Sequence, residues 1–134
     1  MKILLSLLFL VGSLFAQLKE VDNNQLLQMK EKGVVVIDIR RAEEWKSTGI
    51  IEDSKLLTFF DRNGRYDVNQ WLSDFSKLVK SKDTTFVIYC AHANRTKVVG
   101  NFLEKELGFK NVYELKGGIN YGWIQKGMKT VEYK

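Results

Sequence analysis

The stretch "TTFVIYCAHANRT", residues 84–96, holds the only cysteine and the only histidine of this 134-residue chain, Cys90 and His92. Its first six residues, 84–89, are all β-branched or aromatic, which predicts a strand buried on both faces of a sheet. The segment after the cysteine, "RTKVVGNFLEKELG", has the periodicity of a helix that ends at Gly108. We therefore predict a strand, a loop and a helix in this order, with Cys90 at the carboxyl end of the strand.

The same alternation of strands and helices runs through the rest of the chain. Strands are predicted at "VVVIDI" (34–39), "SKLLTFF" (54–60) and "NVYEL" (111–115). Helical segments are predicted at "NNQLLQMKEKG" (23–33), "RRAEEWKSTG" (40–49), "DVNQWLSDFSKLVKS" (67–81) and "GGINYGWIQKG" (117–127). Alternating elements of this kind predict an α/β fold with a mostly parallel central sheet and helices on both faces.

The sequence also predicts where the helices are capped and which of their residues are buried. The first helix is expected to be capped by Asn23 or Asn24 and to stop at Gly33. Residues expected on one face of the helix over 67–81 are Trp71, Leu72, Phe75, Leu78 and Val79. Residues expected on one face of the helix over 95–108 are Val98, Val99, Phe102, Leu103 and Leu107. Trp45, Trp71 and Trp123 are expected to pack in the core or at its rim.

The N-terminus, "MKILLSLLFLVGSLFAQ", has the layout of a secretory signal peptide. Lys2 gives a positive start, an apolar run follows over residues 3–15, and the small Ala16 precedes the expected cleavage point. The alternatives are a buried N-terminal strand or helix and an uncleaved membrane anchor. We expect a signal peptide at 1–16, one domain at 17–134, no stable membrane span after cleavage, and a periplasmic or secreted protein.

The charge pattern argues against a nucleic-acid partner. The formal net charge is +5, but the basic residues are scattered and form no block interleaved with aromatic residues.

A single cysteine can form no disulfide within an exported chain, so the thiol is either reactive, paired with another molecule, or simply packed in the core.

The loop after Cys90 favours the reactive role. In parallel sheets, ligands bind beyond the carboxyl ends of the strands. A strand-to-helix loop directs backbone N–H groups into one concavity, and the small residues Ala91 and Ala93 let it curl. The helix dipole and Arg95 both favour negative charge there, so we expect the thiol to be partly ionised and to act on an anionic substrate.

Three motifs, in order, resemble those of rhodanese-family sulfurtransferases. The loop "CAHANRT" resembles the family's C-x-x-G-x-R-[ST], with Thr96 at its last position. Upstream, "VVVIDIRRAEEWKSTGIIEDSKLL" is similar to the family's D-x-R, E-[FYW] and G-H-I-x-G-A segment, and downstream "NVYELKGGINYGW" is similar to N-V-x-x-L-x-G-G-x-x-x-W. The family's loop glycine is Ala93 here, where a positive φ would carry a steric cost, and its G-H-I is Gly49-Ile50-Ile51.

The resemblance implies a rhodanese-like fold and covalent sulfur transfer. Cys90 would accept a sulfane sulfur from a small anion, thiosulfate or polysulfide, and become a persulfide. The backbone of residues 91–95, that is Ala91, His92, Ala93, Asn94 and Arg95, would cradle the outer sulfur, and a thiol or cyanide-like acceptor would remove it. The resemblance implies no metal and no cofactor. Because Ala91 stands where thiosulfate-using members often carry a cation, efficient use of thiosulfate is not expected.

Other functions remain open on the sequence alone. The domain could be a persulfide carrier or sulfur-binding module in a protein relay, since these roles keep the cysteine. A cysteine phosphatase is disfavoured, because four residues rather than five separate Cys90 from Arg95 and Tyr89 stands where the phosphatase histidine would be. A redox role for the thiol could involve oxidation, but no resolving cysteine exists within the chain.

Three residues near the loop have roles that the sequence leaves partly open. His92 could donate a hydrogen bond to a sulfonate or stabilise the thiolate, or it could be a solvent-facing residue without a chemical role. Asp38 and Arg40, at the end of the strand over 34–39, could contact the substrate, but we expect them instead to support the loop through an ion pair that could include Glu44. Gly117 and Gly118 are expected to form a sharp turn near the cysteine loop.

Overall fold

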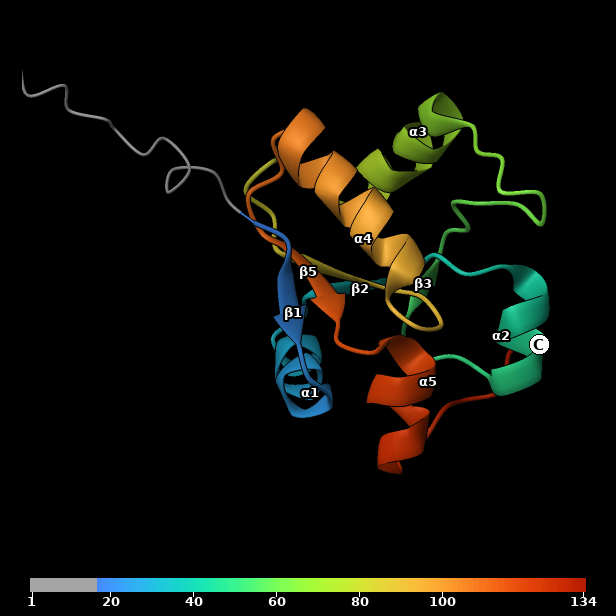
Figure 1. Cartoon of the computed structure of the whole chain (residues 1–134). Helices are drawn as coiled ribbons and strands as arrows, with labels where there is room; N and C mark the ends of the chain where they lie inside the picture. The colour runs from blue at the N-terminus through green and yellow to red at the C-terminus, as the bar shows by residue number, and fades with distance from the viewer. Residues whose placement is uncertain (1–16) are drawn as a thin grey trace, which may run out of the picture.

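The computed structural model describes residues 17–134, and the expected signal peptide at 1–16 lies outside them. Five parallel strands form one sheet in the order β1-β5-β4-β2-β3 (Figure 1). The strands are β1 (Lys19–Val21), β2 (Val35–Asp38), β3 (Lys55–Leu56), β4 (Phe86–Tyr89) and β5 (Val112–Leu115). Over 17–134, none of the helices has the length and apolar character needed to cross a bilayer.

Five α-helices lie around this sheet within residues 17–134. They are α1 (Asn23–Glu31), α2 (Ala42–Thr48), α3 (Val68–Leu78), α4 (Asn94–Asn101) and α5 (Gly118–Gly122). Helix α4 continues as a π-helical turn, Phe102–Glu106, and a 3₁₀ turn, Ile124–Lys126, follows α5. In Figure 1, α3 and α4 lie on one side of the sheet and α1 and α5 lie on the other. The predicted α/β architecture is confirmed.

Strand β4 divides the core into two halves, because successive side chains point to opposite faces. Phe86, Ile88 and Cys90 belong to the buried cluster under α3 and α4. Val87 and Tyr89 belong to the cluster under α1 and α5. The thiol of Cys90 therefore lies on the α4 side of the sheet, at the carboxyl end of a strand that has neighbours on both edges.

The start of α1 differs from the prediction by one residue. Asp22, not Asn23 or Asn24, is the N-cap: its carboxylate accepts a hydrogen bond from the Gln25 backbone N–H, and the Gln25 side chain accepts one from the Asp22 N–H. This reciprocal capping box satisfies two N–H groups at once, which a single asparagine cap would not do. The helix ends before Gly33, as predicted, where φ is +81°.

The predicted core face of the helix over 95–108 is wrong at Val98. Val99 and Leu103 are fully buried, whereas Val98 is 61% exposed. Adjacent helical positions differ by about 100° in direction, so Val98 and Val99 cannot both face the sheet. In the helix over 67–81, Trp71, Phe75 and Val79 are buried as predicted.

The C-terminal segment crosses back over α2. Val131 and Ile50 exchange two backbone hydrogen bonds of 2.8 and 2.9 Å in an isolated antiparallel bridge. The Tyr133 ring meets the edge of Trp45, on α2, with 5.4 Å between ring centroids. The Thr130 hydroxyl donates to the Thr48 carbonyl oxygen. The last residues therefore act as a strap that holds α2 against the domain.

Candidate active site

Cys90 lies at the carboxyl edge of the sheet, where the sequence placed it. Its residue surface is 1% exposed, and its Sγ lies 3.7 Å from the Thr96 hydroxyl oxygen in the first turn of α4. That hydroxyl can accept from the thiol or donate to the thiolate, so one partner serves both protonation states.

The loop over residues 91–93 leads into α4 through a left-handed residue. Ala93 has φ +64° and ψ +16°, the conformation for which glycine is the usual choice. Within residues 17–134 the backbone N–H groups of Ala91, His92 and Ala93 have no hydrogen-bond acceptor, and α4 begins without a side-chain cap. The first N–H groups of α4 also lack partners inside their own helix. Together these donors form an anion-binding loop next to Cys90.

Two glycines hold this loop from the other side. The Cys90 and Ala91 carbonyl oxygens accept hydrogen bonds from the Ile119 and Asn120 N–H groups, at 2.9 and 3.0 Å. This contact requires glycine at position 118, because a Cβ there would lie 2.6 Å from the Cys90 carbonyl oxygen. The sharp turn expected at Gly117 and Gly118 is present, with φ of +75° and +64°. The Cys90 and Ala91 carbonyl oxygens are thus bound by α5, whereas, within residues 17–134, the N–H groups of residues 91–93 remain available to a ligand.

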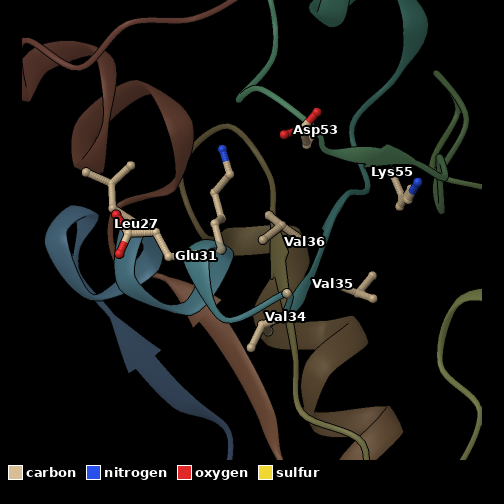
Figure 2. A pocket seen from close by; sticks show the side chains of 9 residues that line it. Leu27, Glu31, Val34, Val35, Val36, Asp53 and Lys55 are labelled. Carbon is tan, nitrogen blue, oxygen red and sulfur yellow. The ribbon is translucent and has the colours of Figure 1, made fainter.

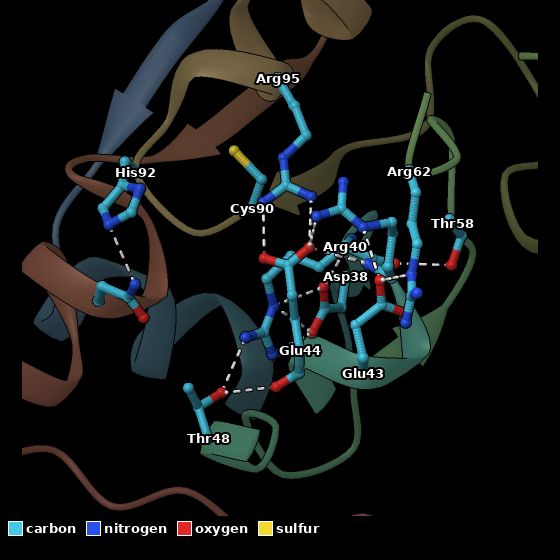
Figure 3. Close-up of polar contacts among 12 residues, drawn as sticks. Asp38, Arg40, Glu43, Glu44, Thr48, Thr58, Arg62, Cys90, His92 and Arg95 are labelled. Carbon is cyan, nitrogen blue, oxygen red and sulfur yellow. Dashed lines mark hydrogen bonds and ion pairs between the residues drawn. The ribbon is translucent and has the colours of Figure 1, made fainter. Parts of the chain in front are cut away.

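Arg95 does not offer a free charge to this loop. Its guanidinium donates to both oxygens of Glu44 on α2, at 2.6 and 2.8 Å (Figure 3). Burial alone would raise the pKa of Glu44, but the hydrogen bonds from Arg95 and from the Arg41 backbone outweigh burial and lower it. The pKa of Arg95 is raised, chiefly by its hydrogen bond to Glu44. The pair stays ionised at neutral pH, and its charges largely cancel.

Asp38 and Arg40 form the expected ion pair, but they support α2 rather than the cysteine loop directly. Both side chains are buried, and Arg40 donates to the Asp38 carboxylate at 2.8–3.1 Å. The same guanidinium reaches the Thr48 hydroxyl and the Gly49 carbonyl oxygen at the end of α2. The expectation that Glu44 joins this pair is corrected: Glu44 binds Arg95 and Arg41 instead.

His92 projects from the loop on the side of α5. Its Nε2 lies 3.1 Å from the Asn120 side-chain nitrogen, and its ring centroid lies 4.6 Å from that of Tyr121. When the Asn120 amide donates, Nε2 is the acceptor and the ring proton is on Nδ1. Figure 3 shows the imidazole directed toward this amide and away from Arg95. The contact orients the ring toward α5 and is compatible both with a role in binding substrate and with a purely structural position.

The sequence reasoning missed a second cation near the loop. The Lys97 ammonium binds the buried Glu114 carboxylate of β5 and donates to the Ala93 carbonyl oxygen at 3.4 Å. Burial raises the pKa of Glu114, and the hydrogen bond to Glu114 raises that of Lys97. A carboxylate inside the apolar strand "NVYEL" was the available signal, because a buried charge requires a partner. Both cations beside the loop are thus already paired.

A hollow of 560 Å³ lies at the amino ends of β2 and β3, at the far end of these strands from the cysteine loop (Figure 2). Its lining includes Val34 and Val35 at the start of β2 and Lys55 at the start of β3. The charged side chains around it, Lys30, Glu31, Asp53 and Lys55, balance one another. It is remote from the carboxyl ends of the strands, where this architecture binds ligands. In the part of the chain that the structure describes, no three His, Cys, Asp or Glu side chains are grouped to hold a metal ion.

Comparison with known families agrees with this geometry. The model of the rhodanese-like domain matches residues 22–125, which include every strand but β1 and the whole cysteine loop. The chain belongs to the rhodanese-like domain family. The matched residues include all three motifs that resemble the family's motifs, and the match confirms the family assignment.

Several characterised proteins resemble this rhodanese-like domain. Thiosulfate sulfurtransferase GlpE of Haemophilus influenzae is 26% identical over 108 residues, which are 80% of this chain and 89% of that protein. The tRNA uridine(34) hydroxylase of Protochlamydia amoebophila is 31% identical over 100 residues; the chain spans 29% of its length. The polysulfide-sulfur transferase homodimer of Wolinella succinogenes has the same fold, with a TM-score of 0.65 at 20% identity, covering 92% of this chain and 85% of that one.

Proposed function

We propose that this rhodanese-like domain is a sulfurtransferase that carries sulfur as a persulfide on Cys90. One observation carries the proposal: within residues 17–134 the N–H groups of the loop beside the thiol have no acceptor, while α5 binds the Cys90 and Ala91 carbonyl oxygens. Such a loop stabilises negative charge on a sulfur atom bound to Sγ. Membership of a family with sulfurtransferase members supports it further.

The reaction would proceed in two displacement steps. The Cys90 thiolate attacks the sulfane sulfur of the donor, the donor's sulfur–sulfur bond breaks, and the donor leaves with the electron pair of that bond. The Cys90 persulfide then holds its outer sulfur against the free amides. An acceptor thiolate or cyanide attacks the outer sulfur, and Cys90 leaves as thiolate. The Cys90 thiol donates to the Thr96 hydroxyl, which can in turn donate once Cys90 is a thiolate.

Polysulfide suits this site better than thiosulfate. Thiosulfate brings a sulfonate group, whose negative charge calls for an unpaired cation within the loop itself or on α4. Arg95 is bound to Glu44, Lys97 is bound to Glu114, and Ala91 supplies no charge. A polysulfide presents sulfur atoms alone, which the loop amides can bind. A protein persulfide donor is the alternative, in which case the domain acts as a carrier in a relay.

The direct test is the intact mass of the protein after incubation with polysulfide or with thiosulfate. We expect a gain of about 32 Da, one sulfur atom, from polysulfide, which cyanide removes and which Cys90→Ser abolishes. Failure to gain sulfur from either donor would overturn transfer from small donors.

In Glu44→Gln the charge of Arg95 is no longer cancelled, so loading from thiosulfate should rise relative to loading from polysulfide, whereas Glu52→Gln should leave that ratio unchanged.

We also propose that the protein is exported, on the basis of the signal-peptide pattern at residues 1–16. Expression of the full chain in a bacterial host, followed by fractionation and N-terminal sequencing, tests this. A periplasmic form that begins at Gln17 would support export, and a full-length form confined to the cytoplasm would contradict it.

A further inference from the structure

A groove leads away from the cysteine loop, between α4 and the segment over residues 59–67. Its first part, a hollow of 430 Å³, is lined by Asn94 and Arg95 at the start of α4 and by Arg41 and Arg62. Its second part, a hollow of 250 Å³, is apolar and is lined by Phe59, Tyr66 and Val99 among others. Phe60 and Val98 line both parts, so the groove is continuous. Its size is in the range of small-molecule sites.

The apolar part is built by an ordered segment and is open to solvent. Phe59 packs on Phe60 and stacks on Tyr66, with ring centroids 4.7 and 5.3 Å apart. The Asp61 carboxylate holds the turn between them by accepting the Asn63 and Arg65 N–H groups. Tyr66 and Val98 are each 61% exposed, which is unusual for apolar surface facing across a groove. Phe59 and Val99, which line the apolar part, belong to the same buried cluster as Cys90.

The polar part can bind an anion. Arg62 is 77% exposed, and within residues 17–134 only its Nε has a partner, the Glu43 carboxylate. The Nη groups of Arg62 are free to bind a carboxylate. Arg41 shares the same Glu43 oxygen, so one carboxylate serves two guanidinium groups. Guanidinium groups bind carboxylates in a two-pronged geometry that an ammonium cannot match.

We propose that this groove binds the sulfur acceptor, and that the acceptor is an organic thiol with a carboxylate near the thiol and an apolar tail. The proposal rests on the persulfide function given above. Because the arginines and the cysteine loop border the same part of the groove, thiol and carboxylate lie at one end of the ligand. The tail lies along Phe60 and Val98 into the apolar part.

The transfer step needs no further reactant. The thiolate of the acceptor attacks the outer sulfur of the Cys90 persulfide, and a new sulfur–sulfur bond forms. The bond between the outer sulfur and Cys90 Sγ breaks, and its electron pair remains on Sγ as thiolate. The acceptor leaves as a persulfide anion that keeps the negative charge of the outer sulfur, so neither oxidant nor reductant is consumed.

Three model thiols separate the parts of the ligand. N-octanoyl-cysteine has the thiol, the carboxylate and the tail; N-acetyl-cysteine lacks the tail; N-octanoyl-cysteamine lacks the carboxylate. The protein is loaded with polysulfide, its mass is checked, and the second-order rate constant for loss of the outer sulfur is measured, with cyanide as a reference. We expect N-octanoyl-cysteine to react at least about tenfold faster than N-acetyl-cysteine and several-fold faster than N-octanoyl-cysteamine.

Matched variants assign these preferences to the groove. Val98→Glu places a carboxylate between the two parts and should bring the octanoyl-to-acetyl ratio close to one, whereas Ile124→Glu, at an exposed apolar residue outside the groove, should not change it. Arg62→Gln should reduce the preference for the carboxylate, whereas Arg65→Gln, on the same segment but outside the groove lining, should not. Equal rates for the three thiols, with normal loading and removal by cyanide, would overturn the proposal.

A binding measurement distinguishes this proposal from the persulfide function. N-octanoyl-serine has a hydroxyl in place of the thiol and cannot take sulfur. It should bind the unloaded protein and shift the backbone NMR signals of Tyr66 and Val98, and Val98→Glu should weaken this binding. If loading fails while N-octanoyl-serine still binds, sulfur transfer is wrong and the groove stands as a ligand site. If N-octanoyl-serine does not bind, the groove does not recognise this class of ligand.

Discussion

Ala93 shows how one residue departs from an expected glycine without changing the loop. An alanine in the left-handed region costs about 1–2 kcal/mol relative to a right-handed conformation. The buried methyl group of Ala93 offsets part of this cost, since a buried methylene contributes about 0.8 kcal/mol. The sequence raised the question of a positive φ here, and the structure answers it with φ +64°.

We expect Ala93→Gly to change the free energy of unfolding by less than about 1 kcal/mol, because relief of strain and loss of the methyl nearly cancel. Ala91→Gly is the matched control: Ala91 is also buried but has no positive φ, so its replacement should destabilise more, by about 1 kcal/mol. Urea denaturation of both variants measures the difference. Equal destabilisation would mean that Ala93 is not strained.

The ion pair between Glu44 and Arg95 makes stability depend on pH. The folded-state pKa of Glu44 is lowered from its ordinary 4.5, so its contribution is fully present above the unfolded pKa and is lost as pH falls through the folded pKa. At neutral pH, Glu44→Gln should lower the free energy of unfolding by about 1–2 kcal/mol, since the pair is mostly buried and bidentate.

The difference between wild type and Glu44→Gln should stay constant from pH 7 down to about pH 5.5 and shrink below about pH 4.5. Urea denaturation at four pH values between 7 and 3 measures it. Glu52→Gln, at an exposed carboxylate with no ion pair within residues 17–134, should change stability by less than about 0.5 kcal/mol at every pH. A difference that grows on acidification would contradict the ion-pair explanation.

At the scale of elements, the turn between β5 and α5 determines the position of the cysteine loop. Gly118→Ala would place a Cβ against the Cys90 and Ala91 carbonyl groups, in addition to the strain of its positive φ. We expect a loss of at least about 2 kcal/mol in the free energy of unfolding and a fall of more than about tenfold in the rate of persulfide loading. Intact mass against time measures the second quantity.

Gly127→Ala provides the control for this prediction. Gly127 also has a positive φ, +80°, but a Cβ there would meet nothing within 4 Å. It should lose only about 1 kcal/mol of stability and load sulfur at the wild-type rate. If both variants load equally well, the close approach at Gly118 does not control the loop.

The elements that the sequence predicts well are those with long apolar patterns. β2 and β4 lie in continuous, mostly apolar runs. α3 has the apolar periodicity of a helix, from which the burial of Trp71 and Phe75 follows. Strand β1 was missed because it has three residues, Lys19–Val21, of which only Val21 is buried. Its position comes from pairing with β5, which no local pattern encodes.

The candidate site is predictable where it depends on chain order and not where it depends on side-chain pairing. Cys90, the loop amides and the double glycine follow from the order strand, loop, helix. The partner of Arg95 does not, because Glu44 lies 51 positions away and three arginines compete for two carboxylates near it. Ion pairs of this kind are decided by how α2 packs against α4.

At the scale of the whole molecule, the C-terminal strap connects the end of the chain to the site. It holds α2 through the Ile50–Val131 bridge and through Tyr133 on Trp45, and α2 carries Glu44. Deletion of residues 129–134 should lower the free energy of unfolding by about 1–3 kcal/mol, because two backbone hydrogen bonds and an aromatic contact are lost.

Hydrogen exchange tests where this loss is felt. Amide protons of α2 should exchange faster in the deleted protein, whereas those of α3, which the strap does not contact, should change only as much as global stability requires. Uniform loss of protection across both helices would mean that the strap stabilises the domain as a whole and not α2 in particular.

The single, buried thiol also makes the native chain its own reporter. A thiol-specific reagent has one target, Cys90, and that target is 1% exposed. When opening is rare and fast, the observed labelling rate equals the opening equilibrium constant multiplied by the rate for a free thiol. The rate at which a disulfide reagent releases colour therefore reports the fraction of protein in which Cys90 is exposed, without any engineered label. Ligands that close the loop will slow this reaction, and ligands that open it will accelerate it.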